Sequence, residues 1–335
     1  MKPVSIINND LDDRLHIGFI VGTTCNYKCH YCFESCNDGK YRWPTDLNLI
    51  TKNLQHLIEI YKIKFNKNSI RLHITGGEPT LWPELGEFAK YFKKIVGCKI
   101  TISTNGTRTL RFWEQYAEFF DDIAISIHNE RCDVNHLIEI MDYIYLHHPD
   151  VLINGTVLMD PLNWSRSEEI ASKLTAHLTP WLLKTRPVLT QGKMDLFDET
   201  QINYMADKIK KMPPKERIDR YKELEIIQKD EPNVIAILED GTSVKYNTFN
   251  FLENNWHHFK GWKCNLGIDR IGIERNGDVQ GICGARNLFG LNQPINIYDS
   301  KFTEKFTTNI IQPTICPQQS CLCATDIRMT KHVSV

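Results

Sequence analysis

Three cysteines between residues 25 and 32 have the types and the spacing of ligands for a metal cluster. Cys25, Cys29 and Cys32 are separated by three and then by two residues. Three thiolates at this spacing can bind three irons of a cuboidal iron–sulfur cluster, which leaves the fourth iron open to a small molecule. A zinc finger would need a second pair of ligands nearby, and a C-x-x-C redox pair would leave Cys25 without a role. We therefore expect a cluster with one open iron.

A second motif, at residues 75–79, could bind the molecule at this open iron. It contains Gly76, Gly77, Glu78 and Pro79 and follows an apolar stretch at residues 69–74. Glycines let a backbone approach a ligand closely, and the carboxylate of Glu78 can pair with an amino group. A Gly-Gly-Glu-Pro turn alone is usually only a loop, so its value here lies in its distance from the three cysteines.

Together, the two motifs resemble those of the radical S-adenosylmethionine (radical SAM) superfamily. The resemblance implies a catalytic 4Fe–4S cluster on Cys25, Cys29 and Cys32, whose open iron binds the amino and carboxylate groups of S-adenosylmethionine. In this family, an electron from the cluster cleaves the cofactor to a 5′-deoxyadenosyl radical, which takes a hydrogen atom from the substrate. The resemblance also implies an electron donor such as flavodoxin or ferredoxin as a partner.

The resemblance further implies which residues contact S-adenosylmethionine. Tyr31 matches an aromatic position near the adenine, and residues 76–79 match the motif described above. The other expected contacts, at the ends of strands, are Ser103, Asn105, Ser126 and Arg186. Arg186 could instead pair with an anionic substrate or form an ion pair within the barrel. We interpret His128 as a surface residue, with a place at the same mouth as the alternative.

Five further cysteines follow much later in the chain: Cys264, Cys283, Cys316, Cys321 and Cys323. Asn276-Gly277 lies between two strand-like stretches and predicts a β-hairpin that brings Cys264 and Cys283 to its ends. The group resembles the SPASM or shorter twitch extension of radical SAM enzymes, which implies one auxiliary 4Fe–4S cluster on four of the five thiols. It departs from the family pattern in the five residues between Gly277 and Cys283 and in the final C-x4-C-x-C spacing. A structural zinc site on the same residues is the alternative.

Cys132 is a further candidate for chemistry. It lies just beyond a predicted strand, on the side of the barrel where the chemistry is expected. A thiol there could return a hydrogen atom to a substrate radical, as in the peptide epimerases of this superfamily. The alternative is an inert buried thiol, which is the more common state of a free cysteine. Cys36 is a weaker candidate for the same role.

The elements that must position these residues alternate between strand and helix from residue 16 to about residue 190. The predicted strands are 16–21, 69–75, 99–103, 122–127, 151–158 and 181–189. The predicted helices include 45–62, 83–96, 134–147 and 167–177. This alternation predicts an α/β fold, an open (β/α)6 partial TIM barrel, which the family resemblance also implies. In such barrels the chemistry lies at the C-terminal ends of the strands, where both motifs fall.

The composition changes after the barrel. Two helices, 200–212 and 215–229, are predicted on either side of Pro213-Pro214, and a hairpin is predicted at 234–238 and 244–246. We expect a small C-terminal, cysteine-rich domain of a β-hairpin and helix. The expected domains are an N-terminal extension (1–15), the radical SAM barrel (16–195), a connecting region (196–254) and an auxiliary-cluster domain (255–335).

Composition excludes several classes of protein. The 335 residues carry a formal net charge of −1, so no global charge favours nucleic acid or an anionic membrane. No apolar run is long enough to span a bilayer and no signal sequence is evident, so we expect a cytoplasmic protein. The chain has 11 cysteines, and their clustering indicates metal binding rather than disulfides.

We expect a radical SAM enzyme, of oxidoreductase or isomerase type, that modifies a peptide by oxidation, cross-linking or epimerisation. Peptide modification is ranked first because auxiliary clusters of this type most often occur with it. The short segment before the first strand leaves no room for a leader-peptide recognition domain, so a partner protein would have to recognise a peptide. The alternative is a dehydrogenase or isomerase of a small sugar, alcohol or nucleotide. An alternative of another class is a non-catalytic iron–sulfur or zinc protein for electron transfer or scaffolding.

Overall fold

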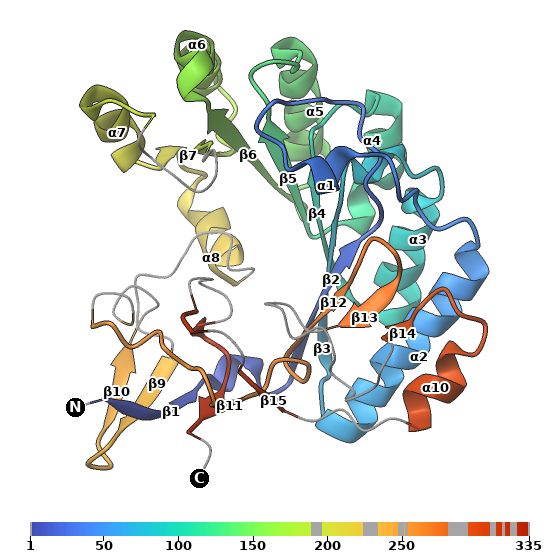
Figure 1. The fold of residues 1–335 in the computed structure, drawn as a ribbon. Coiled ribbons are helices and arrows are strands. Elements are labelled where there is room, and N and C mark those ends of the chain that lie inside the picture. Colours follow the sequence, from blue (N-terminus) through green and yellow to red (C-terminus); the bar gives the residue numbers. More distant parts are fainter. Residues whose placement is uncertain are drawn as a thin grey trace. The chain divides into compact units, whose positions relative to one another are not determined.

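The computed structural model describes residues 2–188, 196–223, 234–246, 251, 254–280, 294–308, 313–316, 319–321 and 327–333 (Figure 1). The chain forms two compact units. The terminal unit contains Met1–Ile20, Pro44–Leu72 and Gln228–Val335, and the central unit contains Val21–Trp43 and His73–Ile227. Because the first three cysteines and the Gly-Gly-Glu-Pro motif all belong to the central unit, the candidate site can be described within it.

Parallel strands form the framework of the central unit. After β3 (Ser69–Thr75), which begins in the terminal unit, they are β4 (Lys99–Thr104), β5 (Asp122–Ile127), β6 (Leu152–Met159) and β7 (Leu182–Pro187). Strands β4 to β7 pair in sequence order, with Ile102 opposite Ile123 and Ile123 opposite Ile153. The short strand β8 (Ile209–Lys211) pairs antiparallel with β7 and ends the sheet, which is therefore open at this edge.

Helices connect these strands and cover one face of them in Figure 1. The α-helices of this unit are α1 (Glu34–Asn37), α3 (Leu85–Tyr91), α4 (Leu110–Tyr116), α5 (Val134–His147), α6 (Trp164–Ala176), α7 (Glu199–Ala206) and α8 (Lys215–Glu223). Short helices are η2 (Pro79–Leu81), the π-helix η3 (Phe92–Val96), η4 (Ala117–Phe119) and η5 (Pro161–Asn163). The start of α5 is fixed by Asp133, whose carboxylate accepts hydrogen bonds from the backbone N–H groups of Asn135 and His136. None of the described helices combines the length and the hydrophobicity needed to cross a bilayer.

The terminal unit contains β1 (Pro3–Ile7), η1 (Asn9–Leu11), β2 (Arg14–Ile20) and α2 (Leu47–Phe65), followed late in the chain by short strands and one helix. These are β9 (Val234–Leu238), β10 (Ser243–Tyr246), β11 (Lys263–Cys264), β12 (Arg270–Ile273), β13 (Asp278–Gln280), β14 (Ile295–Asn296), α10 (Phe302–Thr308), β15 (Thr314–Ile315) and β16 (Lys331–His332). One sheet has the order β10-β9-β1-β16-β11-β15, while β12 pairs parallel with β2.

Several predicted elements are confirmed, and one is wrong. The strands Ser69–Thr75 and Asp122–Ile127 and the helix Val134–His147 have their predicted bounds, and the hairpin of β9 and β10 forms with its second strand one residue longer than predicted. The hairpin around Asn276-Gly277 also forms, between β12 and β13, with Gly277 at a φ of +88° that favours glycine. The helix predicted at 200–212 ends at Ala206, because residues 209–211 pair with the open edge of the sheet instead. Residues 189 and 224–229 of two other predicted elements lie outside the described residues.

The fold class is confirmed as a mixed α/β fold with a parallel sheet that does not close. The predicted domain bounds stay a prediction. The sequence did not predict β8, because a strand of three residues carries almost no periodic signal of its own. This strand forms through its pairing with β7.

One buried carboxylate in this framework predicts a pH-dependent stability. Asp122, at the start of β5, is 5% exposed and accepts a hydrogen bond of 2.7 Å from Asn154 Nδ2. Burial raises the pKa of Asp122 to about 7, although Asn154 and Lys184 lower it. Since this folded-state pKa lies above that of an unfolded aspartate, the stabilisation present at low pH is lost as the pH rises from about 4 to about 7, by roughly 1.4 kcal/mol per pH unit.

Asp122→Asn is expected to remove this pH dependence, because the amide oxygen still accepts the hydrogen bond from Asn154 but cannot ionise. The measurement is the urea midpoint of both proteins across this pH range. An equally steep decline in both proteins would show that another group causes it.

Candidate metal centre

Three thiols converge on one cavity of about 160 Å³ in the central unit. The cavity is lined by Cys25, Cys29 and Cys32 together with backbone of the glycine motif. Cys29 is 6% exposed, and burial raises its pKa to about 11. Burial also raises the pKa values of Cys25 and Cys32. A bound cation offsets such a shift, because a thiol that coordinates a metal loses its proton.

The glycine motif packs directly on the cysteine loop. The backbone N–H of Gly77 donates to the carbonyl of Gly22 at 3.0 Å, and that of Glu78 donates to the carbonyl of Thr24 at 2.9 Å. A Cβ atom on Gly77 would lie 2.4 Å from the carbonyl oxygen of Thr24, directly before Cys25. At both Gly76 and Gly77 an added Cβ would clash with backbone of the cysteine loop, so these glycines are required for the contact between this loop and the glycine motif. The sequence alone had suggested them for contact with a ligand.

Gly77→Ala is expected to displace the cysteine loop, since backbone atoms cannot give way as a flexible side chain can. We expect a loss of most of the iron bound after reconstitution, measured as iron and sulfide per chain. Gly39→Ala is the matched control. Gly39 lies on the segment that contains the three cysteines, and no atom lies within 4 Å of its added Cβ. The control variant should bind as much iron as the natural chain, and its free energy of unfolding should fall only by the roughly 1 kcal/mol expected for alanine at a positive φ. Equal iron in all three proteins would contradict the prediction.

Glu78 is held inside the protein by four hydrogen bonds. Its Oε1 accepts from the backbone N–H of Thr80 at 3.0 Å and from the hydroxyls of Thr80 and Thr104 at 2.6 and 2.7 Å, and its Oε2 accepts from the backbone N–H of Asn105 at 2.6 Å. The residue is 3% exposed, and neither Glu78 nor Pro79 lines the cavity. Its carboxylate joins the turn after β3 to the end of β4, and its contact with the cofactor stays a prediction.

Besides Gly76 and Gly77, three of the predicted cofactor contacts at the ends of strands line the cavity. They are Ser103 and Asn105, around the end of β4, and Ser126 on β5. The side-chain amide of Asn105 donates to Asn26 Oδ1 at 2.8 Å and so reaches the cysteine loop. Arg186, on β7, is exposed and does not line this cavity.

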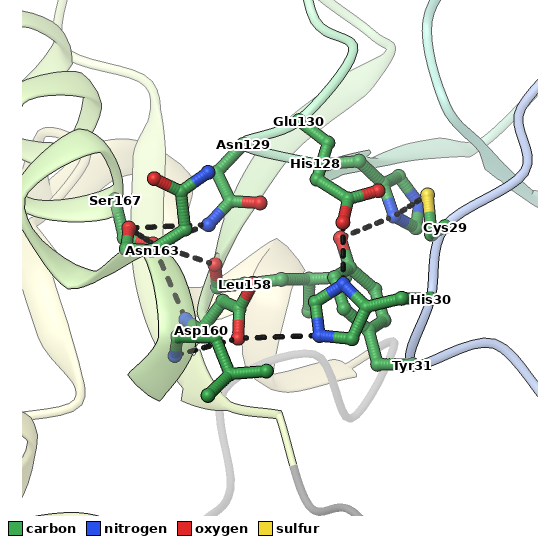
Figure 2. A network of polar contacts seen from close by, with 11 residues as sticks. Cys29, His30, Tyr31, His128, Asn129, Glu130, Leu158, Asp160, Asn163 and Ser167 are labelled. Atoms are coloured by element: carbon green, nitrogen blue, oxygen red, sulfur yellow. Dashed lines mark hydrogen bonds and ion pairs between the residues drawn. The ribbon is translucent and has the colours of Figure 1, made fainter.

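His128 belongs to the cavity, so its interpretation as a surface residue is wrong. Its Nδ1 lies 3.0 Å from the hydroxyl of Tyr31 and 3.4 Å from Cys29 Sγ, and the two rings stack at 4° (Figure 2). Tyr31 thus supports the wall of the site from behind His128. Burial lowers the pKa of His128 to about 4. The signal in the sequence was its position two residues after Ser126, on the same side of a strand end.

Cys132 lies elsewhere in the central unit. It lines a separate cavity of about 270 Å³ beside the start of α5, together with Arg166, Glu169 and Lys173 of α6. The structure therefore does not bring Cys132 together with the three cysteines, and its role as a hydrogen donor stays a prediction. Cys36 does line the cavity of the three thiols.

The later cysteines are described only in part, since Cys283 and Cys323 lie outside the described residues. In the ladder of β11 and β15, Cys264 is opposite Thr314, and the backbone N–H of Cys316 donates to the carbonyl of Trp262 at 2.8 Å. Cys264 and Cys316 are therefore diagonal neighbours on one face of this ladder. The backbone N–H of Cys321 donates to the carbonyl of His257 at 2.8 Å. A second cluster on this group stays a prediction.

Part of the chain matches a known sequence family. Residues 19–145 match the radical SAM superfamily. An S-adenosylmethionine-dependent nucleotide dehydratase of Thermoplasmatales archaeon (strain ISO4-H5) is 27% identical over 148 residues, 40% of this chain and 49% of that protein. A GTP 3′,8-cyclase of Haemophilus ducreyi is 30% identical over 127 residues, 35% of each chain. The chain thus spans about half or less of the length of these relatives.

Two solved structures resemble the fold. Native anSMEcpe with bound AdoMet aligns with 86% of this chain and 80% of its own, at 15% identity and a TM-score of 0.47. Streptococcus suis SuiB bound to precursor peptide SuiA aligns with 88% of this chain and 64% of its own, at 13% identity and a TM-score of 0.47.

Proposed function

We propose that this chain, which contains a radical SAM domain at residues 19–145, uses the cavity at Cys25, Cys29 and Cys32 to modify a nucleotide. The observation that carries the proposal is the convergence of these three thiols and the glycine motif on one cavity. Three soft thiolates with room beside them fit a cuboidal iron–sulfur cluster with an open iron. The donor set therefore agrees with the group that the family uses.

When bound, a 4Fe–4S cluster and S-adenosylmethionine supply a radical able to remove a hydrogen atom from an unactivated carbon. The residues of the chain would hold and orient these groups. Cys25, Cys29 and Cys32 would bind three irons, while Ser103, Asn105 and Ser126 offer hydroxyl and amide groups to the cofactor at the same wall. The imidazole of His128, wedged between Tyr31 and Cys29, would keep the cysteine loop in place.

Nucleotides are the substrate class that the relatives favour. The two relatives described above are a nucleotide dehydratase and a GTP cyclase. This supports the alternative that the sequence ranked second, a small-molecule substrate, over a peptide. The matched part is less than half of the chain, so we infer the class of substrate and not the particular nucleotide.

We also propose that Cys264, Cys316 and Cys321 contribute to a second metal centre. Cys264 and Cys316 are diagonal neighbours on one ladder, so their side chains lie on the same face of it. Iron and sulfide counts of a Cys25, Cys29 and Cys32 triple-alanine variant test this second centre. Residual iron with sulfide supports a cluster, and residual zinc supports a structural zinc site. If the variant contains no iron and no zinc, the proposal of a second metal centre is contradicted.

The test of the main function is an anaerobic assay. The chain is reconstituted with iron and sulfide, reduced with dithionite and given S-adenosylmethionine with each ribonucleoside triphosphate in turn. One nucleotide should raise the formation of 5′-deoxyadenosine by at least about tenfold, because substrate binding completes the site. Deuterium on the ribose of that nucleotide should appear in the product 5′-deoxyadenosine.

The two parts of the proposal fail in different ways. If no 5′-deoxyadenosine forms although the cluster is assembled, the chain is not a radical SAM enzyme under these conditions and the non-catalytic alternative is favoured. If it forms at a rate that no nucleotide changes, the substrate class is wrong while the enzyme class stands.

A further inference from the structure

Three metal-binding side chains meet next to the cysteine loop, from three separate segments of the central unit. His30 lies between Cys29 and Cys32, Glu130 follows β5, and Asp160 follows β6. His30 Nδ1 contacts Glu130 Oε1, and His30 Nε2 lies 3.6 Å from Asp160 Oδ1 (Figure 2). One ligand atom from each residue lies within 4.8 Å of the other two. We call these three residues the His30 triad.

The carboxylate of Asp160 has one buried oxygen that no hydrogen bond from the described residues satisfies. Its side chain is 1% exposed, and its Oδ1 accepts a hydrogen bond of 3.1 Å from the backbone N–H of Leu162. Its Oδ2 is buried without a hydrogen-bond partner among the described residues. A buried carboxylate oxygen without a donor is costly, and a cation beside it removes the cost. This oxygen belongs to the same carboxylate whose Oδ1 lies 3.6 Å from His30 Nε2.

A polar network holds the two carboxylate-bearing segments in place. The hydroxyl of Ser167, on α6, accepts from the backbone N–H of Asp160 at 3.2 Å and from Asn129 Nδ2 at 2.6 Å. Asn129 directly precedes Glu130. The side chain of Ser167 therefore contacts both the residue before Glu130 and the backbone of Asp160 (Figure 2). Fixed outer partners of this kind orient ligands in metal sites.

We propose that the His30 triad binds one divalent cation of the first transition row. One imidazole nitrogen and two carboxylate oxygens form a mixed set that suits Mn²⁺, Fe²⁺ or Zn²⁺, and the two negative charges balance a doubly charged ion. Three protein ligands leave further positions for water or for an oxygen of a substrate. The cation takes the place of the hydrogen bond between His30 and Glu130 and of the 3.6 Å contact between His30 and Asp160. This site uses none of the three cluster thiols and does not depend on the proposed function.

Mn²⁺ is the probe that tests this site in the full chain after metals are removed with a chelator. Mn²⁺ prefers oxygen and nitrogen ligands, so the 11 cysteines compete poorly for it. We expect one saturable site in an EPR titration that counts free Mn²⁺, and a coupling to one imidazole nitrogen in pulsed EPR. His30→Gln should remove that nitrogen coupling. Asp160→Asn and Glu130→Gln should each weaken binding by at least about tenfold.

Glu34→Gln is the matched control. Glu34 is exposed on α1, just after Cys32, so its replacement changes the charge near the cysteine loop without removing a ligand. Its Mn²⁺ affinity should equal that of the natural chain. Asp160→Asn keeps an oxygen that can accept from Leu162, and Glu130 is 23% exposed, so at least one acid variant is expected to keep its fold, which circular dichroism checks.

Two results would overturn the proposal. Absence of a saturable Mn²⁺ site in the natural chain would leave the His30 triad as a polar contact between three segments, with one hydrogen bond to Glu130 and one ion pair to Asp160. Equal Mn²⁺ affinity in the natural chain, Asp160→Asn and Glu130→Gln would place the bound ion elsewhere.

Discussion

Cys29→Ala is expected to abolish the proposed iron–sulfur cluster of the central unit, whereas Cys36→Ala should leave it intact. Both thiols line the same cavity and lie on the same segment of the chain. They differ in that only Cys29 belongs to the Cys-x3-Cys-x2-Cys motif. The pair of variants therefore separates a defined ligand triad from a mere concentration of thiols.

The size of the expected effect follows from the ligand count. With two thiolates remaining, a cuboidal cluster would have two open irons instead of one and would be exposed to loss of iron. Partners outside the ligand sphere already change metal affinity or activity by roughly 10–100-fold, so loss of a direct ligand should exceed this range. Iron and sulfide per chain, visible absorbance and 5′-deoxyadenosine formation are the measurements.

Cys36 makes the comparison decisive because it is an exposed residue whose loss leaves no buried gap. Cys36→Ala is expected to keep the iron, the sulfide and the reaction within about twofold of the natural chain. If Cys36→Ala lost as much iron as Cys29→Ala, the cluster would be bound by a different set of thiols than the motif indicates.

The fold was predictable wherever the pattern of apolar residues was long and regular. Helix α5 follows the spacing of Leu137, Ile140, Met141 and Ile144, all buried, and begins at its Asp133 cap. The short strands of the terminal unit carry no such pattern, since β11, β14, β15 and β16 have two residues each. Their pairing is decided by partners far away in sequence. Such pairings cannot be read from local periodicity.

The candidate site was predictable in its thiols and less so in its surroundings. Spacing predicted Cys25, Cys29 and Cys32 as ligands, because a cluster constrains the distances between its ligands, and these three thiols line one cavity. Spacing could not show that Glu78 is buried under four hydrogen bonds, or that His128 stacks on Tyr31. These contacts arise from loops at the ends of different strands, and their side chains meet only once the parallel sheet has formed.

Lys67→Met is expected to destabilise the terminal unit by about 3–5 kcal/mol, because it leaves a buried acid without its counter-ion. Lys67 and Asp269 have side chains that are each 3% exposed, and Lys67 Nζ lies 2.7 Å from Asp269 Oδ1. The same ammonium group donates to the carbonyls of Leu11 and Asp12 at 2.6 and 3.1 Å. It thus joins the segment before β2 to the turn before β12.

The sign of the effect with pH follows from the pKa of Asp269. Burial raises this pKa, and Lys67 lowers it. Without Lys67 the folded-state pKa moves further above its unfolded value, so the variant should lose stability as the pH rises and regain part of it in acid. Urea unfolding at acidic and neutral pH measures this change.

Two further variants complete the argument. Lys67→Met combined with Asp269→Asn removes both charges and should recover more than half of the lost free energy of unfolding, since what costs most is the unpaired charge. Lys64→Met, at an exposed lysine three residues earlier, should change stability by no more than about 0.5 kcal/mol. If the double variant were as unstable as Lys67→Met alone, the loss would come from the packing of the lysine stem and its bonds to the two carbonyls, and not from the stranded carboxylate.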